Sequence, residues 1–242
     1  KLRENNLEYE YIKNLNLDLV IVVAYGQILP RNFLSLSKKG FINLHASILP
    51  KWRGAAPIQR AIMNCDSKIG VSIMKIEEKL DSGPVISKKE MKLDPKLTFG
   101  ELESALSIIG ADLLISCLNN LGEGKLNLKK QIHEEASYAK KINKEETKID
   151  WNLNANAVLG HIHGLSPNPG AWFQYEKERY KVLKAKISLI SGKAGTILDE
   201  NLTVGCGKNS IQILELQREG KKRQTSKEFL LGKKINKNTN LI

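Results

Sequence analysis

The sequence predicts an α/β protein in which a mostly parallel sheet domain precedes a small β-barrel. In the first half, apolar runs of strand length alternate with segments of helical periodicity, which is typical of parallel sheets with helical crossovers. Beyond Trp151, short alternating segments are separated by Gly- and Asn-containing turns, which favours a small barrel. A highly charged stretch lies between the two parts. We therefore expect a sheet domain over residues 1–124, a linker over 125–150 and a barrel over 151–242.

Strands and helices of the expected sheet domain follow one another along the chain. The run from 18 to 24 is continuously apolar, as expected of a strand that is covered on both faces. The helix before it should turn Leu7, Tyr11 and Ile12 inward. Strands are expected at 18–24, 41–45, 70–76 and 85–93, and helices at 6–16, 32–39, 57–64 and from residue 98 onward.

The helix that begins near Thr98 has the clearest signature. Thr98 and Glu101 have the spacing of a capping box, in which each side chain bonds the backbone N–H of the other residue. Apolar residues then recur at helical spacing, at Leu102, Leu106, Ile109 and Leu113. A helix that ends near Gly122 is therefore predicted.

Four polar side chains fall at or just after the carboxyl ends of expected strands: Tyr25, Asn43, His45 and Asp81. In open α/β sheets, ligands bind outside these ends. Asn43 and His45 are two residues apart, so in a strand both side chains lie on one side. The sequence therefore predicts one shared site.

An amide, an imidazole and a carboxylate together can transfer an acyl group to an amine without a covalent enzyme intermediate. Asn43 would donate to the developing oxyanion, His45 would move protons, and Asp81 would orient the ring or take a proton through water. Each residue has a structural alternative as well: an Asn that bonds backbone at a strand end, a packed His, and an Asp-x-Gly turn.

Positive charge is concentrated in the C-terminal part. The formal net charge is +12, and residues 151–242 contribute 15 Lys and Arg against 7 Asp and Glu. Cations alternate with apolar residues along one expected strand, which places several of them on its outer side: Lys177, Arg179, Lys181, Lys184 and Lys186. This asymmetry favours a phosphate-bearing partner. The alternative is a solvated, lysine-rich face, because Lys and Asn are abundant throughout.

Neither metal nor redox chemistry is indicated. The cysteines are scattered, without a Cys-x-x-Cys pair, which favours reduced thiols and a cytoplasmic location: Cys65, Cys117 and Cys206. Three other histidines lack ligands at metal-binding spacing: His133, His161 and His163. No Gly-x-Ser-x-Gly or P-loop occurs. No apolar stretch approaches the length of a membrane span, so we expect no membrane partner.

These motifs resemble the folate-dependent formyltransferases. The Asn-x-His and Asp-x-Gly pieces are shared by that whole family, whereas 52–60 and the C-terminal region resemble the branch that acts on initiator methionyl-tRNA. The resemblance runs over nearly the whole chain, and the pieces that match are 23–30, 43–62, 70–74, 80–83, 138–142 and 144–151.

The resemblance implies a Rossmann-like sheet domain and an OB-like barrel. It implies transfer of a formyl group from 10-formyltetrahydrofolate, a cosubstrate, to initiator methionyl-tRNA by a protein that is monomeric at full length and uses no metal. Catalysis is assigned to Asn43, His45 and Asp81. Folate binding is assigned to Tyr25, Gly26, Ser47, Leu49 and Pro50, and tRNA binding to Arg53, Lys181, Lys184 and Lys186. The residues themselves leave Lys51 and Arg53 open between folate carboxylates and tRNA phosphates.

Members of the family have a further amino-terminal stretch that carries the first strands of the sheet, so we expect this chain to lack them. Two other functions remain open. A formyltransferase that acts on a sugar nucleotide or on glycinamide ribonucleotide shares the Asn, His and Asp residues but does not need a basic barrel. A fragment that binds RNA without catalysis is the other alternative.

Overall fold

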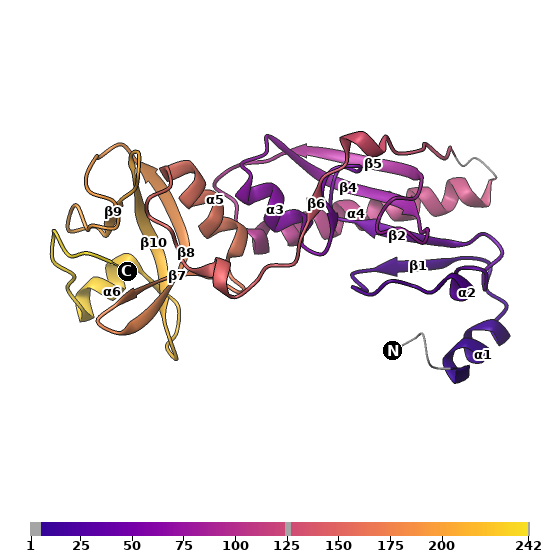
Figure 1. Cartoon of the computed structure of the whole chain (residues 1–242), viewed down its shortest axis with the longest axis horizontal. Helices are drawn as coiled ribbons and strands as arrows, with labels where there is room; N and C mark the ends of the chain where they lie inside the picture. Colours follow the sequence, from indigo (N-terminus) through magenta and orange to yellow (C-terminus); the bar gives the residue numbers. More distant parts are fainter. Residues whose placement is uncertain (1–5, 124–126, 242) are drawn as a thin grey trace. The chain divides into compact units, whose positions relative to one another are not determined.

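A computed structural model describes residues 6–123 and 127–241, which form two compact units (Figure 1). The first unit contains residues up to 57, 68–92 and 104–141. The second contains 58–67, 93–103 and 142–242. Each unit therefore draws on segments that are separated in the sequence, whereas the expected division at 124 and 150 stays a prediction.

The sheet of the first unit has four strands in the order β1 (Val20–Val23), β2 (Phe41–His45), β4 (Lys68–Lys75) and β5 (Val85–Lys92). Strand β2 is parallel to β1 but antiparallel to β4, and β4 is antiparallel to β5. The α/β class is confirmed, but among the described strands of this sheet only the pairing of β1 with β2 is parallel. A short loop joins β4 directly to β5, and such a loop can only connect antiparallel neighbours.

Helix α4 (Phe99–Gly122) packs on this sheet. Cys117 on the helix forms a buried cluster with Ile42 and Ile73. A Cβ atom at Gly110 would lie 2.9 Å from a methyl carbon of Leu44, so the absence of a side chain there allows the helix to approach the strand closely.

The predicted capping box at the start of α4 is confirmed. The backbone N–H of Thr98 donates to Glu101 Oε2 (2.8 Å), and the N–H of Glu101 donates to Thr98 Oγ1 (3.4 Å). By its 24-residue length and its composition, α4 could also cross a membrane, contrary to the expectation from the sequence. A single helix of this kind is weak evidence for a membrane span, because the core helix of a soluble protein can have the same length and composition.

The amino-terminal elements differ from their predictions. Helix α1 (Asn6–Asn14) exists, but Leu7 and Tyr11 are 82% and 68% exposed. Tyr9 of α1 instead contacts Phe33 of the short helix α2 (Arg31–Leu34), with the ring centroids 5.4 Å apart. Residues of β1 alternate between half-buried and exposed, so the prediction of a strand covered on both faces is wrong for the described residues.

The second unit is an antiparallel sheet packed around one core. Strands β7, β8, β10 and β11 follow one another across the sheet in the order β11-β10-β8-β7, and β9 also pairs with β10. Among the described residues no pairing joins the outer strands β11 and β7. The elements are α3 (Pro57–Met63), α5 (Ala155–Leu165), β7 (Ala171–Tyr175), β8 (Glu178–Ser188), β9 (Thr203–Gly205), β10 (Ser210–Arg218), β11 (Gln224–Thr225) and α6 (Ser226–Gly232).

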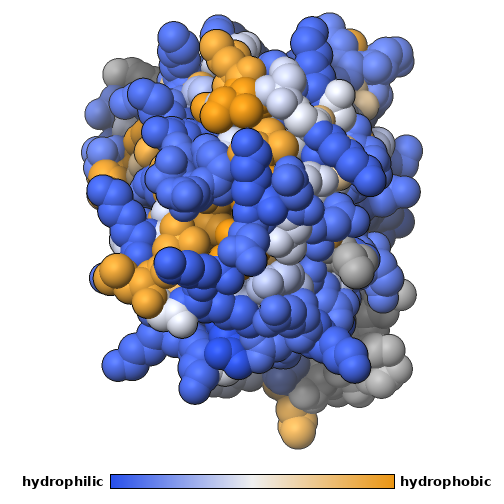
Figure 2. Space-filling view, turned by 90° about the vertical axis from the view of Figure 1, so that its left-hand side faces the viewer, coloured by the Kyte–Doolittle hydropathy of each residue, from blue (hydrophilic) through white to orange (hydrophobic). Residues whose placement is uncertain are grey.

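Stacked aromatic rings and a close pair of helices are two features of the packing in this unit. The rings of Phe173 and Tyr180 stack with centroids 5.5 Å apart, and both side chains are buried. Helix α5 approaches α3 so closely that a Cβ atom at Gly160 would lie 2.8 Å from the carbonyl oxygen of Ile62. At the surface, Figure 2 shows mostly hydrophilic side chains, with hydrophobic ones gathered in places among them.

Residues expected to form a free linker are divided between the units. Strand β6 (Tyr138–Ala139) pairs in parallel with β3 (Arg53–Gly54) in the first unit. In the second unit, Glu146 accepts two hydrogen bonds, 2.8 and 2.9 Å long, from the guanidinium of Arg60 on α3. This stretch therefore makes specific contacts within both units.

Candidate active site

Strand β2 presents Asn43 and His45 on one side of the sheet, as the spacing predicts. Asn43 is half-buried, and its side-chain amide makes no hydrogen bond within the part of the chain that the structure describes. An amide donor that can be reached by solvent and has no protein acceptor is free to bond a ligand oxygen.

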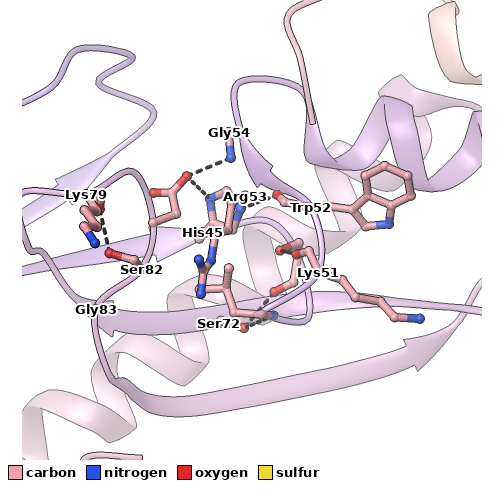
Figure 3. A network of polar contacts seen from close by, with 12 residues as sticks. His45, Lys51, Trp52, Arg53, Gly54, Ser72, Lys79, Ser82 and Gly83 are labelled. Carbon is pink, nitrogen blue, oxygen red and sulfur yellow. Dashed lines mark hydrogen bonds and ion pairs between the residues drawn. The ribbon is translucent and has the colours of Figure 1, made fainter. Parts of the chain in front are cut away.

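The imidazole of His45 is held by a hydrogen bond at Nε2, and its Nδ1 faces Asp81 (Figure 3). Its Nε2 lies 2.8 Å from the carbonyl oxygen of Trp52. Because a carbonyl only accepts, Nε2 carries the hydrogen. Its Nδ1 lies 3.7 Å from Asp81 Oδ2, which is longer than a hydrogen bond. Nδ1 is therefore the ring nitrogen left for a reacting group.

Asp81 lies in the loop between β4 and β5, in a left-handed backbone conformation with φ of +46°. Its Oδ2 accepts a hydrogen bond of 2.8 Å from the backbone N–H of Gly54. The side chain of Asp81 is 14% exposed. The structure thus brings the predicted carboxylate and imidazole together, with Oδ1 left for another partner.

Ser72 of β4, which the sequence analysis did not single out, supports the loop that follows His45. Its Oγ donates to the carbonyl of Ser47 (2.7 Å) and accepts from the N–H of Leu49 (3.1 Å). The hydroxyl of Ser47 in turn donates to the carbonyl of Lys51 (2.6 Å). Ser72 is completely buried. A serine within the apolar run of β4 was the signal that could have revealed it.

The predicted folate residues differ in how much of each is accessible. Tyr25 is 41% exposed, and Gly26 has a positive φ of +69°. Ser47 and Leu49 are each 2% exposed, so their side chains support the loop from within. Pro50 is half-buried. Contact of these residues with folate stays a prediction, and for Ser47 and Leu49 it would involve backbone atoms.

Arg53 is placed where the predicted tRNA contact does not fit. The residue is 3% exposed, and its guanidinium donates to Gln131 Oε1 (2.8 and 3.2 Å) and lies 3.2 Å from His133 Nδ1. A buried guanidinium that is engaged in this way cannot reach a phosphate on a partner's surface. The sequence missed this because a cation between Trp52 and Gly54 resembles an exposed loop residue.

The three predicted tRNA lysines of β8 have different environments. Lys184 Nζ lies 2.7 Å from Glu101 Oε1, so its charge is paired. Burial alone would raise the pKa of Glu101, but hydrogen bonds from Lys184 and Thr98 outweigh it and lower that pKa to about 2. Lys181 is half-buried and Lys186 exposed, and neither has an acidic partner among the described residues.

The remaining histidines of the second unit have structural contacts. His163 is 1% exposed; its Nε2 accepts from the N–H of Ala185, so its Nδ1 donates to the carbonyl of Pro95. His161 Nε2 bonds the carbonyl of Glu146 at 2.7 Å. Burial lowers the pKa of both imidazoles. Within the described ranges no group of three or more His, Cys, Asp or Glu side chains could hold a metal ion.

Comparison with known proteins identifies the relatives of this chain. Residues 1–118 match the family described as formyl transferase, and residues 141–234 match the family described as formyl transferase, C-terminal domain. The chain is 50% identical over 241 residues to methionyl-tRNA formyltransferase of Pelagibacter ubique, covering 99% of this chain and 78% of that protein. It is 46% identical over 227 residues to methionyl-tRNA formyltransferase of Bradyrhizobium diazoefficiens, covering 92% and 73%.

Solved structures show the same fold. Methionyl-tRNA formyltransferase from Clostridium thermocellum superposes with a TM-score of 0.60 at 21% identity, over 76% of this chain and 80% of that one. HypX from Aquifex aeolicus, solved with tetrahydrofolic acid, gives a TM-score of 0.69 at 17% identity, over 96% of this chain and 43% of that one. On the identity and coverage of its curated relatives, the chain belongs to the methionyl-tRNA formyltransferase family.

Proposed function

We propose that this protein transfers a formyl group from 10-formyltetrahydrofolate to the amino group of initiator methionyl-tRNA. The observation that carries the proposal is the arrangement of Asn43, His45 and Asp81. An amide without a protein acceptor and an anchored imidazole lie on one strand, and a carboxylate lies 3.7 Å from that imidazole. Two relatives that are 50% and 46% identical to this chain are named methionyl-tRNA formyltransferase.

Each of the three side chains has a separate part in the reaction. When the amine attacks the formyl carbon, negative charge develops on the formyl oxygen, and the amide of Asn43 donates to that oxygen. Asp81 Oδ1 accepts a proton of the attacking amine, because Oδ2 is already held by Gly54. His45 passes a proton from Nδ1 to N10 of the folate, because Nε2 is held by the carbonyl of Trp52. The bond between the formyl carbon and N10 then breaks, and tetrahydrofolate leaves.

The folate cosubstrate supplies the formyl group. Tyr25, Gly26 and the loop of residues 47–50 are the groups we propose to hold it, with the support of Ser72 keeping that loop in one conformation. The amide of Asn43, which lacks a protein partner in the described residues, fits a carbonyl oxygen of such a ligand.

For the tRNA, we propose a surface on the second unit that is built around Trp172. Its indole N–H donates to Thr147 Oγ1 (3.0 Å), which fixes the ring. The guanidinium carbon of Arg179 lies 4.3 Å from the ring centroid, and Lys148 Nζ lies 5.9 Å from it. Lys181 is the cross-strand partner of Trp172. These cations have no acidic partner among the described residues, so their charge is available to phosphates.

The contacts around Trp172 change the set of residues that we propose to bind tRNA. Lys181 and Lys186 remain candidates, Lys184 is neutralised by Glu101, and Arg179 is added because the indole ring orients it. An arginine that stacks on an aromatic ring keeps its N–H groups free for bidentate contact with a phosphate. A basic surface of this kind supports a nucleic acid acceptor over a small sugar nucleotide.

We also propose that the reaction takes place in the cytoplasm. The described structure contains no disulfide, and its free thiols are Cys65, Cys117 and Cys206. Burial raises the pKa of Cys206 to about 11, which keeps that thiol protonated and unreactive. Reduced, structural cysteines fit a reducing compartment.

The test is formation of N-formylmethionyl-tRNA from 10-formyltetrahydrofolate and charged initiator tRNA, followed by mass spectrometry of the released amino acid. Asn43→Ala and His45→Ala should each lower kcat by about a hundredfold or more, the size of one oxyanion donor or one positioned acid–base group. Lys88→Ala, an exposed position on β5, is the control. A wild-type chain that forms no product, or variants as fast as the control, would refute the proposal.

A further inference from the structure

Gln131 lies in the stretch that the sequence marks as a linker, yet it is only 8% exposed and uses its whole amide. Its Nε2 donates to the carbonyl oxygens of Asp81 (2.9 Å) and Gly83 (2.7 Å). Its Oε1 accepts two hydrogen bonds from Arg53, from Nε at 3.2 Å and from Nη2 at 2.8 Å. One side chain therefore joins the loop that carries Asp81 to the segment that follows Trp52.

The chemistry of the partners fixes the orientation of this amide. A guanidinium only donates and a carbonyl only accepts, so the oxygen of Gln131 must face Arg53 and its nitrogen must face Asp81 and Gly83. A rotated amide would break all four bonds and place like groups against each other. Arg53 thereby determines which way Gln131 points, and Gln131 determines where the backbone of Asp81 lies.

The carboxylate of Asp81 needs such support. Its backbone has a positive φ of +46°, which is unfavourable for a residue with a side chain, so surrounding contacts must maintain it. On the side-chain end, the N–H of Gly54 holds Oδ2. On the backbone end, Gln131 holds the carbonyl. The hydroxyl of the neighbouring Ser82 donates to the carbonyl of Lys79, within the same loop.

We propose that Gln131 is a positioning residue for formyl transfer, which keeps the Asp81 carboxylate beside His45. This inference rests on the proposed function, because it concerns the same reaction. Within the described part of the chain, Gln131 makes no hydrogen bond with Nδ1 of His45 or Oδ1 of Asp81, so it acts through the backbone of Asp81. A displacement of about 1 Å in a reacting group can lower a rate by as much as a hundredfold.

Gln131→Glu removes the hydrogen bonds to Asp81 and Gly83 but keeps those from Arg53. The carboxylate keeps the acceptors that face Arg53 but has no donor for the carbonyls of Asp81 and Gly83. We expect kcat to fall at least tenfold, with KM for folate and for tRNA within about threefold of wild type. The matched control is His133→Ala, which removes only the other acceptor near Arg53 and should change kcat by less than threefold.

A double-mutant cycle distinguishes positioning from a general loss of structure. In the background of Asp81→Asn, Gln131→Glu should lower the single-turnover rate by less than twofold, because its effect passes through the group already removed. A structural role would instead multiply the two losses. Multiplied losses, or a Gln131→Glu protein as fast as His133→Ala, would overturn the inference.

Titration with a slowly released folate analogue measures the fraction of active molecules. Each rate is divided by that fraction, so that a destabilised Gln131→Glu variant still gives a rate per folded molecule. The proposed function fails on a different result, namely a wild-type chain that forms no N-formylmethionyl-tRNA. A wild type that is active, with Gln131 variants that are equally active, refutes only the positioning role.

Discussion

Replacing Ser72 with alanine should loosen the loop behind the catalytic imidazole. The substitution removes the hydroxyl that bonds the carbonyl of Ser47 and the N–H of Leu49, and both of these residues are 2% exposed. An unsatisfied buried backbone group costs about 1–3 kcal/mol. Two such groups therefore make the closed loop less favourable by about 3 kcal/mol, which corresponds to roughly a hundredfold in the opening equilibrium.

Hydrogen exchange of the Lys51 amide measures this opening. That amide donates to the carbonyl of Ile48 (3.1 Å), and the substitution of Ser72 does not touch it. We expect its protection to fall by about a hundredfold, and kcat to fall with it, because the same loop supplies the carbonyl of Trp52 that holds His45.

Ser87→Ala is the matched control for Ser72→Ala. Ser87 faces Ile73 across the same hairpin, and within the described residues its hydroxyl makes no hydrogen bond. Its replacement should leave the exchange rate of the Lys51 amide unchanged. If Ser72→Ala also leaves that rate unchanged, then the serine does not hold the loop and our explanation of how His45 is anchored is refuted.

Three further outcomes follow from the second unit. Burial lowers the pKa of His163. The neutral imidazole therefore contributes fully to stability above about pH 6.5, and this contribution is lost as the pH falls through the folded-state pKa of His163. His163→Gln should flatten the plot of Tm against pH in that range. The pKa of Glu101 is about 2, so the Tm difference between wild type and Glu101→Gln should shrink as the pH falls from about 4.5 to 2. In tRNA binding, Arg179→Ala should reduce the log–log salt slope by about 1, whereas Lys184→Ala should leave it nearly unchanged because Glu101 already pairs that lysine.

Local patterns in the sequence predicted much of the fold. The strand that carries Asn43 and His45 is found at Phe41–His45, and the capping box at Thr98 begins α4. Both features depend on residues that are neighbours in the sequence, and such short-range signals are reliable when the periodicity is long or the cap is complete. The juxtaposition of His45 and Asp81 was also expected, and the distance between their side chains is 3.7 Å.

Long-range contacts account for what the sequence did not reveal. Gln131 has no periodicity around it, and only its distant partners Asp81 and Arg53 make it important. In β8, an alternating pattern alone would place Lys181 and Lys184 on opposite faces. The register shifts between β8 and β10 around Glu215 alter that alternation, and a β-bulge of this kind leaves no local signal.

The parallel order of strands, from which one shared site was expected, does not account for the position of Asp81. This explains why several separate segments of the chain support that residue. In a parallel sheet the carboxyl ends of neighbouring strands meet at one edge. Here β4 is antiparallel to β2, so Lys75 pairs with Ile42 near the start of β2, whereas His45 lies at its end, about 10 Å further along.

The chain after β4 must therefore turn back along β2 to bring Asp81 to His45. Hydrogen bonds hold both ends of this segment. The N–H of Ile76 donates to the carbonyl of Phe41 at its start. Gly54 and Gln131 hold it at Asp81. Sheet geometry alone positions Asn43 and His45, but it does not position the carboxylate. We therefore expect substitutions that are remote from the reacting atoms to affect catalysis mainly through Asp81, and the contact with Gln131 is where that dependence is greatest.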